Sequence, residues 1–309
     1  MIRELAKKYG YKQEIVKRYI RLFGEDVEEL LKANEAEPKE CIRVNTLKIS
    51  QFQLEKRLRK RGILLREVER GFLIEESPFS ISSTPEYLLG YFYIQGIAEM
   101  QIAPLLNPGD LVIDMCAAPG GKTTHLAQIM GNKGVVIALD VNKDKIKALK
   151  ANIHRLGVTN TIAYFVSALD FSFKAERILL DAPCTGSGII RKDPTRKYSR
   201  DSADIEFCSK LQKDLIRRSI GNLKEDGILV YSTCSLEPEE NEMVIDWTVK
   251  NFPVKVEPID FSVNGAPAAE GFTHPLGEEL HDQIALCRRT FPHVHDCNGM
   301  FVAKLKKRC

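Results

Sequence analysis

The sequence is poor in cysteine and has no long apolar run. Its 309 residues include eight cysteines, too few for the disulfide scaffold of a small secreted protein. No segment approaches the roughly 18 consecutive apolar residues of a membrane-spanning helix. The first residues, MIRELAKKYGYK, carry charges where a signal peptide needs an apolar stretch. We therefore expect a cytoplasmic protein with reduced thiols and no membrane partner.

The sequence also lacks a strong charge of either sign. Its formal net charge of +3 by itself says nothing about binding to nucleic acid. Residues 1–85 contain 18 Lys and Arg against 14 Asp and Glu, an excess of 4 positive charges. The densest basic cluster, from Lys56 to Arg61, fits an RNA-binding surface and an ordinary solvated helix face equally well.

The length of the chain favours two domains. Between Lys12 and Asn34, apolar residues recur at helical spacing and predict two short amphipathic helices. CIRVN and GFLIEE predict strands on either side of a helix over residues 51–61. Residues 1–85 are therefore predicted to form a small α+β domain.

From Gly109 onward, short β-rich runs alternate with helical segments, which is typical of a parallel sheet covered by helices. The predicted strands are LVIDM, VVIALD, IAYFV, RILLD and GILVYST. The predicted helices cover residues 122–130, 143–156, about 201–223 and 238–251. A last strand, MFVAKLKK, is expected at the sheet edge, and residues 256–279 are expected to form a loop. We assign residues 86–309 to this α/β domain.

The loop after the first strand of this domain has the position of a cofactor loop, because ligands of open α/β sheets bind beyond the carboxyl ends of the strands. In DMCAAPGGKTT, Gly120 and Gly121 lead into a helix N-terminus and allow close approach of a ligand. The alternative is a glycine turn that serves only the strand-to-helix geometry. The loop matches neither the GxxxxGK pattern of nucleotide triphosphatases nor the GxGxxG pattern of dinucleotide enzymes.

Two aspartates favour a cofactor that contains adenosine. Asp140 ends the second strand, where a carboxylate suits both hydroxyls of a ribose, and Lys145 follows one helical turn later. Asp170 follows the third strand, where it suits an exocyclic amine such as that of adenine. Because neither contact needs a pyrophosphate, the pattern fits S-adenosylmethionine better than NAD.

Two further strand ends carry cysteine. LLDAPCTGSG and VYSTCSLEPEEN place Cys184 and Cys234 after neighbouring strands, so we expect both thiols in one pocket. The alternative is an ordinary buried thiol, which suits Cys41, Cys208 and Cys309 better.

Two thiols suit methylation of carbon 5 of cytosine. A thiolate that adds to carbon 6 makes carbon 5 nucleophilic, and a second thiol can assist the later proton loss and elimination. Asp181, three residues before Cys184, is a candidate acid near N3 of the base.

Several motifs resemble those of the Nop/Sun family of RNA cytosine-5 methyltransferases. They are DMCAAPGGKT, LLDAPCTGSG and STCSLEPEEN, with RVNTLK at residues 43–48 resembling the family's N-terminal signature. The resemblance implies a Rossmann-like methyltransferase domain behind a small RNA-recognition-like domain. It also implies that Cys234, in the TCS motif, is the nucleophile and that Cys184, in the PC motif, assists release. DNA cytosine methyltransferases use the PC cysteine as nucleophile, so the STCS motif discriminates between the two classes.

The resemblance further implies the other site residues. Lys122 and Asp181 would join the two cysteines in catalysis. The cofactor site would be lined by Cys116, Ala117, Ala118, Pro119, Gly120, Gly121, Lys122, Asp140, Lys145, Asp170 and Asp181. Lys145 stands where many relatives have arginine, which predicts a looser contact. The segment IIRKDPTRKYSR, with five basic residues and one acid, is expected to bind the RNA backbone beside a flipped-out cytosine or else to be a solvated loop.

The compact chain favours tRNA over ribosomal RNA as the substrate, and a monomer is expected. Ribosomal RNA is the alternative. A non-catalytic RNA-binding protein of the same fold is a weaker one, since the cysteines, Lys122 and Asp181 are all present. A methyltransferase for protein glutamine or an exocyclic amine would carry NPPY where DAPC stands.

Histidines and cysteines near the C-terminus are candidate ligands for a zinc ion. His293 and His295 stand near Cys287 and Cys297, but no CxxC pair accompanies them, so no metal site is predicted. A disulfide among these cysteines is a further open alternative.

Overall fold

The computed structural model describes residues 1–308, so the expectation for Cys309 lies outside the described residues. Contacts divide the chain into two compact units. Unit 1 comprises Met1–Pro38, Ala182–Arg217 and the residues from Tyr231 onward, and unit 2 comprises Lys39–Asp181 and Arg218–Val230. The predicted domain boundary at residues 85/86 stays a prediction. No helix among residues 1–308 is long and apolar enough to cross a membrane.

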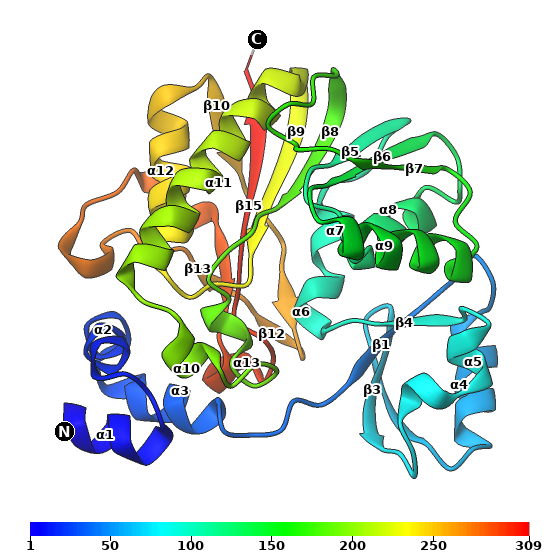
Figure 1. Ribbon diagram of the computed structural model, residues 1–309, viewed down its shortest axis with the longest axis horizontal. Coiled ribbons are helices and arrows are strands. Elements are labelled where there is room, and N and C mark those ends of the chain that lie inside the picture. Colours follow the sequence, from blue (N-terminus) through cyan, green and yellow to red (C-terminus); the bar gives the residue numbers. More distant parts are fainter. Residues whose placement is uncertain (309) are drawn as a thin grey trace. The chain divides into compact units, whose positions relative to one another are not determined.

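Unit 2 begins with a four-stranded antiparallel sheet in the order β2-β3-β1-β4. Its strands are β1 (Cys41–Val44), β2 (Leu64–Val68), β3 (Gly71–Glu76) and β4 (Phe92–Ile94). Figure 1 shows α4 (Gln51–Arg59) and α5 (Pro85–Leu88) beside it. Ser50 and Gln53 form a capping box that starts α4, and Leu54 and Leu58 bury its apolar face with Phe72 and Phe92. The strands predicted from CIRVN and GFLIEE are present, whereas β2 and β4 were not predicted.

The remainder of unit 2 contains the predicted parallel strands. They are β5 (Leu111–Asp114), β6 (Val135–Asp140), β7 (Thr161–Phe165) and β8 (Ala175–Asp181), in the order β8-β5-β6-β7. Short helices α6 (Ile97–Met100) and α7 (Ile102–Leu105) precede them. Helices α8 (Gly121–Ile129) and α9 (Lys143–Leu156) follow β5 and β6, and the Asn142 side chain caps α9. The predicted α/β fold class is therefore confirmed.

Strand β9 (Leu223–Thr233) contributes residues to both units. It neighbours β8 in the strand order, and β15 (Met300–Lys307) follows on its other side. The prediction that β15 lies at the sheet edge is wrong. β14 (Arg288–Thr290) also pairs with β15, as does β10 (Val254–Glu257), and β13 (Ala269–Glu270) pairs with β14.

The segment predicted as a loop, residues 256–279, supplies part of this extra structure. It contains the end of β10, the two-residue strands β11 (Ser262–Val263), β12 (Ala266–Pro267) and β13, and a 3₁₀ turn, η5 (Pro275–Gly277). Strands of two residues are too short to show the alternation by which a strand is recognised in a sequence.

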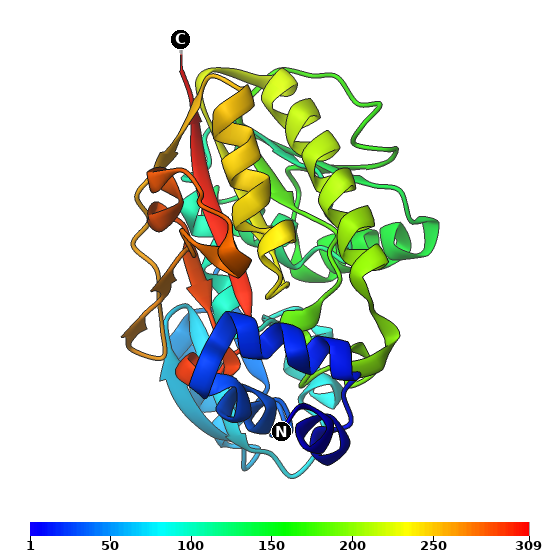
Figure 2. The same cartoon turned by 90° about the vertical axis from the view of Figure 1, so that its left-hand side faces the viewer.

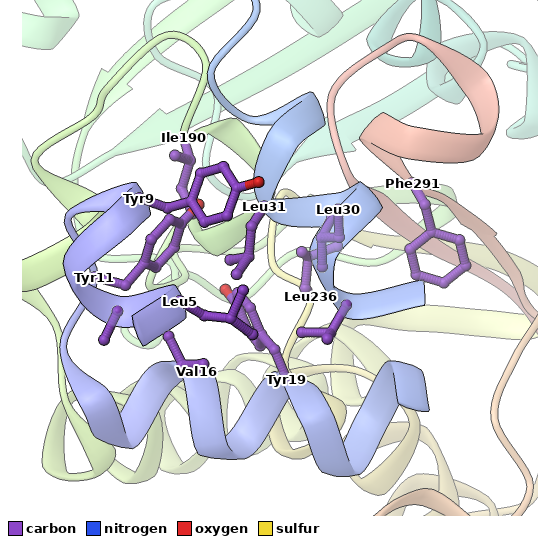
Figure 3. Close-up of a cluster of buried hydrophobic side chains, with 12 residues drawn as sticks. Leu5, Tyr9, Tyr11, Val16, Tyr19, Leu30, Leu31, Ile190, Leu236 and Phe291 are labelled. Carbon is purple, nitrogen blue, oxygen red and sulfur yellow. The ribbon is translucent and has the colours of Figure 1, made fainter. Parts of the chain in front are cut away.

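Three N-terminal helices belong to the core of unit 1. They are α1 (Ile2–Tyr9), which was not predicted, and the predicted α2 (Gln13–Phe23) and α3 (Val27–Ala33). Figure 3 shows Val16 and Tyr19 of α2 and Leu30 of α3 in one cluster with Ile190 and Leu236. Burial of these apolar side chains therefore joins the N-terminal helices to the segments that follow Cys184 and Cys234.

The predicted helices after the cysteine motifs are α11 (Ser202–Asn222) and α12 (Glu242–Asn251). Helix α12 and the unit 1 part of α11 lie side by side in both views (Figures 1 and 2). Two cations of α11 contact the Trp247 ring of α12, with Arg217 at 5.6 Å and Lys213 at 5.9 Å from its centroid. Unit 1 also contains the short helices α10 (Arg196–Ser199) and α13 (Pro292–His295). Its 3₁₀ turns include η3 (Ser187–Ile189) and η4 (Pro238–Glu240).

Candidate active site

The loop between β5 and α8 depends on glycine for its shape. Gly120 is the N-cap of α8 and has a φ of 106°, a conformation that L side chains rarely adopt. A Cβ atom there would lie 2.8 Å from Cδ1 of Leu149 on α9. At Gly121 it would lie 3.1 Å from the ring of Tyr93. The two glycines therefore permit close packing inside unit 2, in addition to any approach of a ligand.

Arg43 of the RVNTLK motif supports the start of α8. Its buried guanidinium donates to the carbonyl oxygen of Gly121 at 2.6 Å, to Oγ1 of Thr124 at 3.0 Å and to Oε1 of Gln95 at 2.6 Å. The N-terminal signature thus braces the predicted cofactor loop from within unit 2. The sequence motif alone does not reveal this role, because the bond to Gly121 joins residues 78 positions apart.

Carboxylates gather around the Cys116 thiol in this loop. Burial and the nearby charges of Asp114, Asp181 and Asp140 raise the pKa of Cys116 well above that of an ordinary thiol, so Cys116 stays protonated. Asp181 accepts a hydrogen bond at 2.6 Å from the Lys122 ammonium, so the structure brings together the two residues expected to assist catalysis.

These residues fit S-adenosylmethionine. Asp140 and Asp181, joined by Asp114 when it is ionised, produce a negative potential that suits a cationic sulfonium. The Asp140 carboxylate accepts from the N–H groups of Ala118 and Asn142 and keeps further lone pairs for ribose hydroxyls. Lys145 is exposed on α9, and Asp170 is exposed in the turn after β7. These contacts to the cofactor stay predictions.

The two predicted catalytic thiols lie together in unit 1. Sγ of Cys184 is 3.3 Å from Sγ of Cys234, as their positions after β8 and β9 predict. Backbone hydrogen bonds from Ala182 to Ser232 and from Gly188 to Cys234 join the two segments. Within residues 1–308 no cysteine forms a disulfide; these cysteines are Cys41, Cys116, Cys184, Cys208, Cys234, Cys287 and Cys297.

The surroundings of Cys184 keep its thiol protonated. The hydrogen bond with Cys234, burial, and the charges of Cys234 and Glu240 raise the pKa of Cys184 well above that of an ordinary thiol. Cys184 therefore holds its proton while Cys234 lies beside it.

Glu240, to which sequence analysis assigned no role, connects the two cysteine segments. Its fully buried carboxylate accepts from the N–H of Thr185 at 2.8 Å and from its hydroxyl at 2.5 Å. It also accepts from the Ser235 hydroxyl and from Nε2 of Gln212 at 3.3 Å. Because Thr185 follows Cys184 and Ser235 follows Cys234, one carboxylate fixes the residue after each thiol.

The other acids of the STCSLEPEENE segment form internal ion pairs. Glu237 and Glu239 pair with Arg18 of α2. Glu242 pairs with Arg289, and both side chains are fully buried. Arg289 also donates to the carbonyl oxygen of Leu236 at 3.1 Å. The acids of the motif therefore hold the segment after Cys234 in place, and their density in the motif was the signal for this role.

Several basic residues predicted to contact RNA are engaged within the protein. Arg191 donates to the carbonyl oxygen of Ala33 at 2.7 Å and to Asp296 at 2.7 Å. Arg196 pairs with Asp193, and Lys197 pairs with Glu35. In the Lys56–Arg61 cluster of unit 2, Arg57 and Arg61 both pair with the buried carboxylate of Glu86. A structural role therefore accounts for much of the basic character of both segments.

Two of the C-terminal histidines and cysteines, His295 and Cys297, form local hydrogen bonds. His295 accepts at Nδ1 from the N–H of Phe291 at 3.0 Å, and Cys297 donates to the carbonyl oxygen of Asn298 at 3.2 Å. Within residues 1–308, no group of three or more His, Cys, Asp or Glu side chains is arranged to hold a metal ion.

Known proteins are similar to nearly the whole chain. A family model described as 16S rRNA methyltransferase RsmB/F matches residues 102–306, and one described as the N-terminal domain of 16S rRNA methyltransferase RsmF matches residues 12–96. The chain is 39% identical to the 28S rRNA (cytosine-C(5))-methyltransferase of Mus musculus, over 99% of the chain and 40% of that protein. It is 37% identical to ribosomal RNA small subunit methyltransferase F of Vibrio parahaemolyticus, over 91% of the chain and 60% of that protein. The chain therefore spans less than two thirds of the length of these curated relatives.

Solved structures cover both units. A methyltransferase homologue from Pyrococcus horikoshii is 42% identical, with a TM-score of 0.89 over 99% of this chain and 98% of its own. NSun6 from the same organism, solved with SFG, is 28% identical, with a TM-score of 0.83 over 96% of this chain and 98% of its own. The chain therefore belongs to the RsmB/F, or Nop/Sun, family of S-adenosylmethionine-dependent RNA cytosine-5 methyltransferases.

Proposed function

We propose that this protein methylates carbon 5 of a cytosine in ribosomal RNA through a covalent bond between Cys234 and carbon 6 of the base. The observation that carries the proposal is the thiol pair itself, with the two sulfur atoms 3.3 Å apart. An RNA-binding protein that had lost its activity would not need this pair.

Ribosomal RNA replaces tRNA as the favoured substrate. The compact length of the chain was the ground for preferring tRNA. The named relatives from Mus musculus and Vibrio parahaemolyticus are both ribosomal RNA methyltransferases, which supports the alternative. Transfer RNA becomes the second substrate to be tested.

Cys234 would act first. Its thiolate adds to carbon 6, a C–S bond forms, and the electrons of the C5–C6 double bond make carbon 5 nucleophilic. S-adenosylmethionine, when bound by the loop of residues 116–122, supplies the methyl group. The Lys122–Asp181 pair would hold a proton for N3 of the base, which favours the addition.

Cys184 would act second. Once Cys234 is bonded to carbon 6, it no longer carries the hydrogen bond or the charge that raise the pKa of Cys184. Cys184 can then release its own proton to water more readily and, as a thiolate, accept the proton from carbon 5. The C–S bond breaks, Cys234 leaves as a thiolate, and the proton on N3 returns to the Lys122–Asp181 pair. Adduct formation itself would thus prepare the release step.

The test uses single-cysteine variants with methyl-labelled S-adenosylmethionine and either ribosomal RNA or tRNA. Cys234→Ala should abolish methyl transfer, and full activity in this variant would refute the assignment. Cys184→Ala should form the adduct without releasing it, so a protein–RNA band should accumulate on denaturing gels. The release role is wrong if no such band forms on an RNA that the wild type methylates. Bisulfite sequencing of RNA from cells with and without the gene then identifies the modified cytosine, and a site in tRNA alone would overturn the ribosomal assignment.

A further inference from the structure

Two adjoining cavities in unit 1 begin at the residues that follow Cys184. The first, of about 270 Å³, lies between α2, the Thr185–Ser187 segment and the start of α11. The second, of about 410 Å³, continues along α11 as far as Lys213. Both are lined by Arg18, Ser202 and Ile205, so they adjoin at these residues. We call the two cavities together the α2–α11 groove.

The charge of this groove favours an anionic ligand. Seven basic and five acidic residues line it, and two of the acids, Glu237 and Glu239, are already paired with Arg18. A third acid, Asp201, accepts hydrogen bonds from the N–H groups of Ala203 and Asp204 at the start of α11. Two of the basic residues, Arg196 and Arg200, pair with Asp193 and Asp204, which lie outside the lining. The lining as a whole still carries two more basic than acidic residues. Its other basic residues are Lys17, Arg21, Lys210 and Lys213.

The groove also offers surfaces for nucleobases. Ile15 and Ile205 are apolar walls of the first cavity, and Arg196 and Arg200 line the same cavity. The Nε of Arg200 is buried and has no hydrogen-bond partner within residues 1–308. Unpaired RNA bases stack on planar guanidinium groups, while Lys and Arg charges bind the phosphates between them. A ligand that alternates planar bases with phosphates matches both kinds of wall.

We propose that the α2–α11 groove binds single-stranded RNA immediately beside the target cytosine, on one side of it only. This inference rests on the proposed function, because the groove begins at Thr185, next to Cys184. A free nucleotide would occupy one cavity, whereas a strand would use the two cavities as neighbouring subsites. The groove would thereby select which flank of the target must be unpaired.

Charge reversal of two exposed lysines tests the groove. The double variant Lys17→Glu/Lys210→Glu should bind a short single-stranded segment of ribosomal RNA roughly tenfold more weakly. The slope of log Kd against log salt should fall by about two, one for each lost phosphate contact. Lys17→Arg/Lys210→Arg should restore both values. Lys7→Glu, an exposed lysine of α1 outside the groove, is the matched control. Equal affinities and slopes for the double variant and this control would overturn the proposal.

Trimming the substrate separates this proposal from the proposed function. Shortening a methylated RNA one nucleotide at a time should raise the KM of the wild type from one end of the strand only. In the double variant this asymmetry should disappear. If the wild type methylates the RNA but both ends tolerate trimming equally, the groove proposal fails alone. If the wild type methylates no RNA, the proposed function fails, and the affinity measurements still decide whether the groove binds RNA.

Discussion

The loop after β5 and the segment after β9 are held rigid by different means. In unit 2, the predicted cofactor loop takes its shape from the backbone, with a positive φ at Gly120 and a carbonyl of Gly121 bound by Arg43. In unit 1, the two cysteine segments are joined through a side chain, the buried carboxylate of Glu240.

The two kinds of support suit the proposed roles of the two regions, which are cofactor binding and thiol chemistry. A loop that receives a cofactor needs a fixed backbone, whereas two reacting thiols need a defined separation together with the freedom to exchange a proton. A carboxylate beside the thiols supplies both, because its charge also acts on Cys184. The two regions should therefore respond differently to substitution.

The largest effect is expected at Glu240. Glu240→Ala leaves the buried donors of Thr185 and Ser235 without their acceptor and frees the two cysteine segments to separate, so kcat should fall by about 100-fold or more. Loss of the carboxylate charge should also lower the pKa of Cys184, so the rate of Cys184 alkylation by iodoacetamide should rise at lower pH than in the wild type.

Two variants control this experiment. Glu240→Gln keeps the size of the side chain and should retain more activity than Glu240→Ala. Glu279→Ala removes an exposed acid of unit 1 and should behave as the wild type. An unchanged alkylation profile in Glu240→Ala would show that the carboxylate serves packing alone.

A substitution at Gly120 tests whether the backbone conformation gives the predicted cofactor loop its shape. Gly120→Ala should lower the free energy of unfolding by about 1–3 kcal/mol, because alanine is strained at this φ and its Cβ presses on Leu149. Affinity for S-adenosylmethionine, measured by calorimetry, should fall while alkylation of the cysteines stays unchanged. Gly131→Ala is the matched control, since it has a φ of 60° but nothing within 4 Å of the added atom. If the free energy of unfolding fell equally in the two variants, packing of residue 120 against α9 would have no role.

Sequence patterns predicted the parts of the molecule that depend on local order. The apolar period of residues 143–156 marked α9, and the run MFVAKLKK marked β15, because each element is long enough to show its periodicity. Placement after neighbouring strands was also enough to bring Cys184 and Cys234 together.

Features that depend on distant contacts escaped prediction. Glu240 meets Thr185 across 55 positions, and no local pattern distinguishes it from its neighbour Glu239. Likewise, the basic segment of residues 189–200 looked like an RNA-binding surface, because its internal partners, such as Glu35 and Ala33, lie far away in the sequence. A sequence does not show whether a charged side chain already forms an ion pair within the protein.

The smallest expected effect concerns Asp114, which precedes the cofactor loop. Burial raises the pKa of its carboxyl to about 7, while its hydroxyl partner Thr123 and the charge of Lys122 oppose the shift. The folded protein therefore retains a proton that the unfolded chain has lost above pH 4. Stability should fall by roughly 1 kcal/mol as the pH rises from 6 to 8. Asp114→Asn still accepts the hydrogen bond from Thr123 but cannot ionise. Between pH 6 and pH 8, the free energy of unfolding measured in urea should therefore fall by roughly 1 kcal/mol less in this variant than in the wild type. Asp144→Asn, at an exposed acid of α9, should keep the wild-type slope, and a wild-type slope in Asp114→Asn would mean that Asp114 is ionised throughout this range.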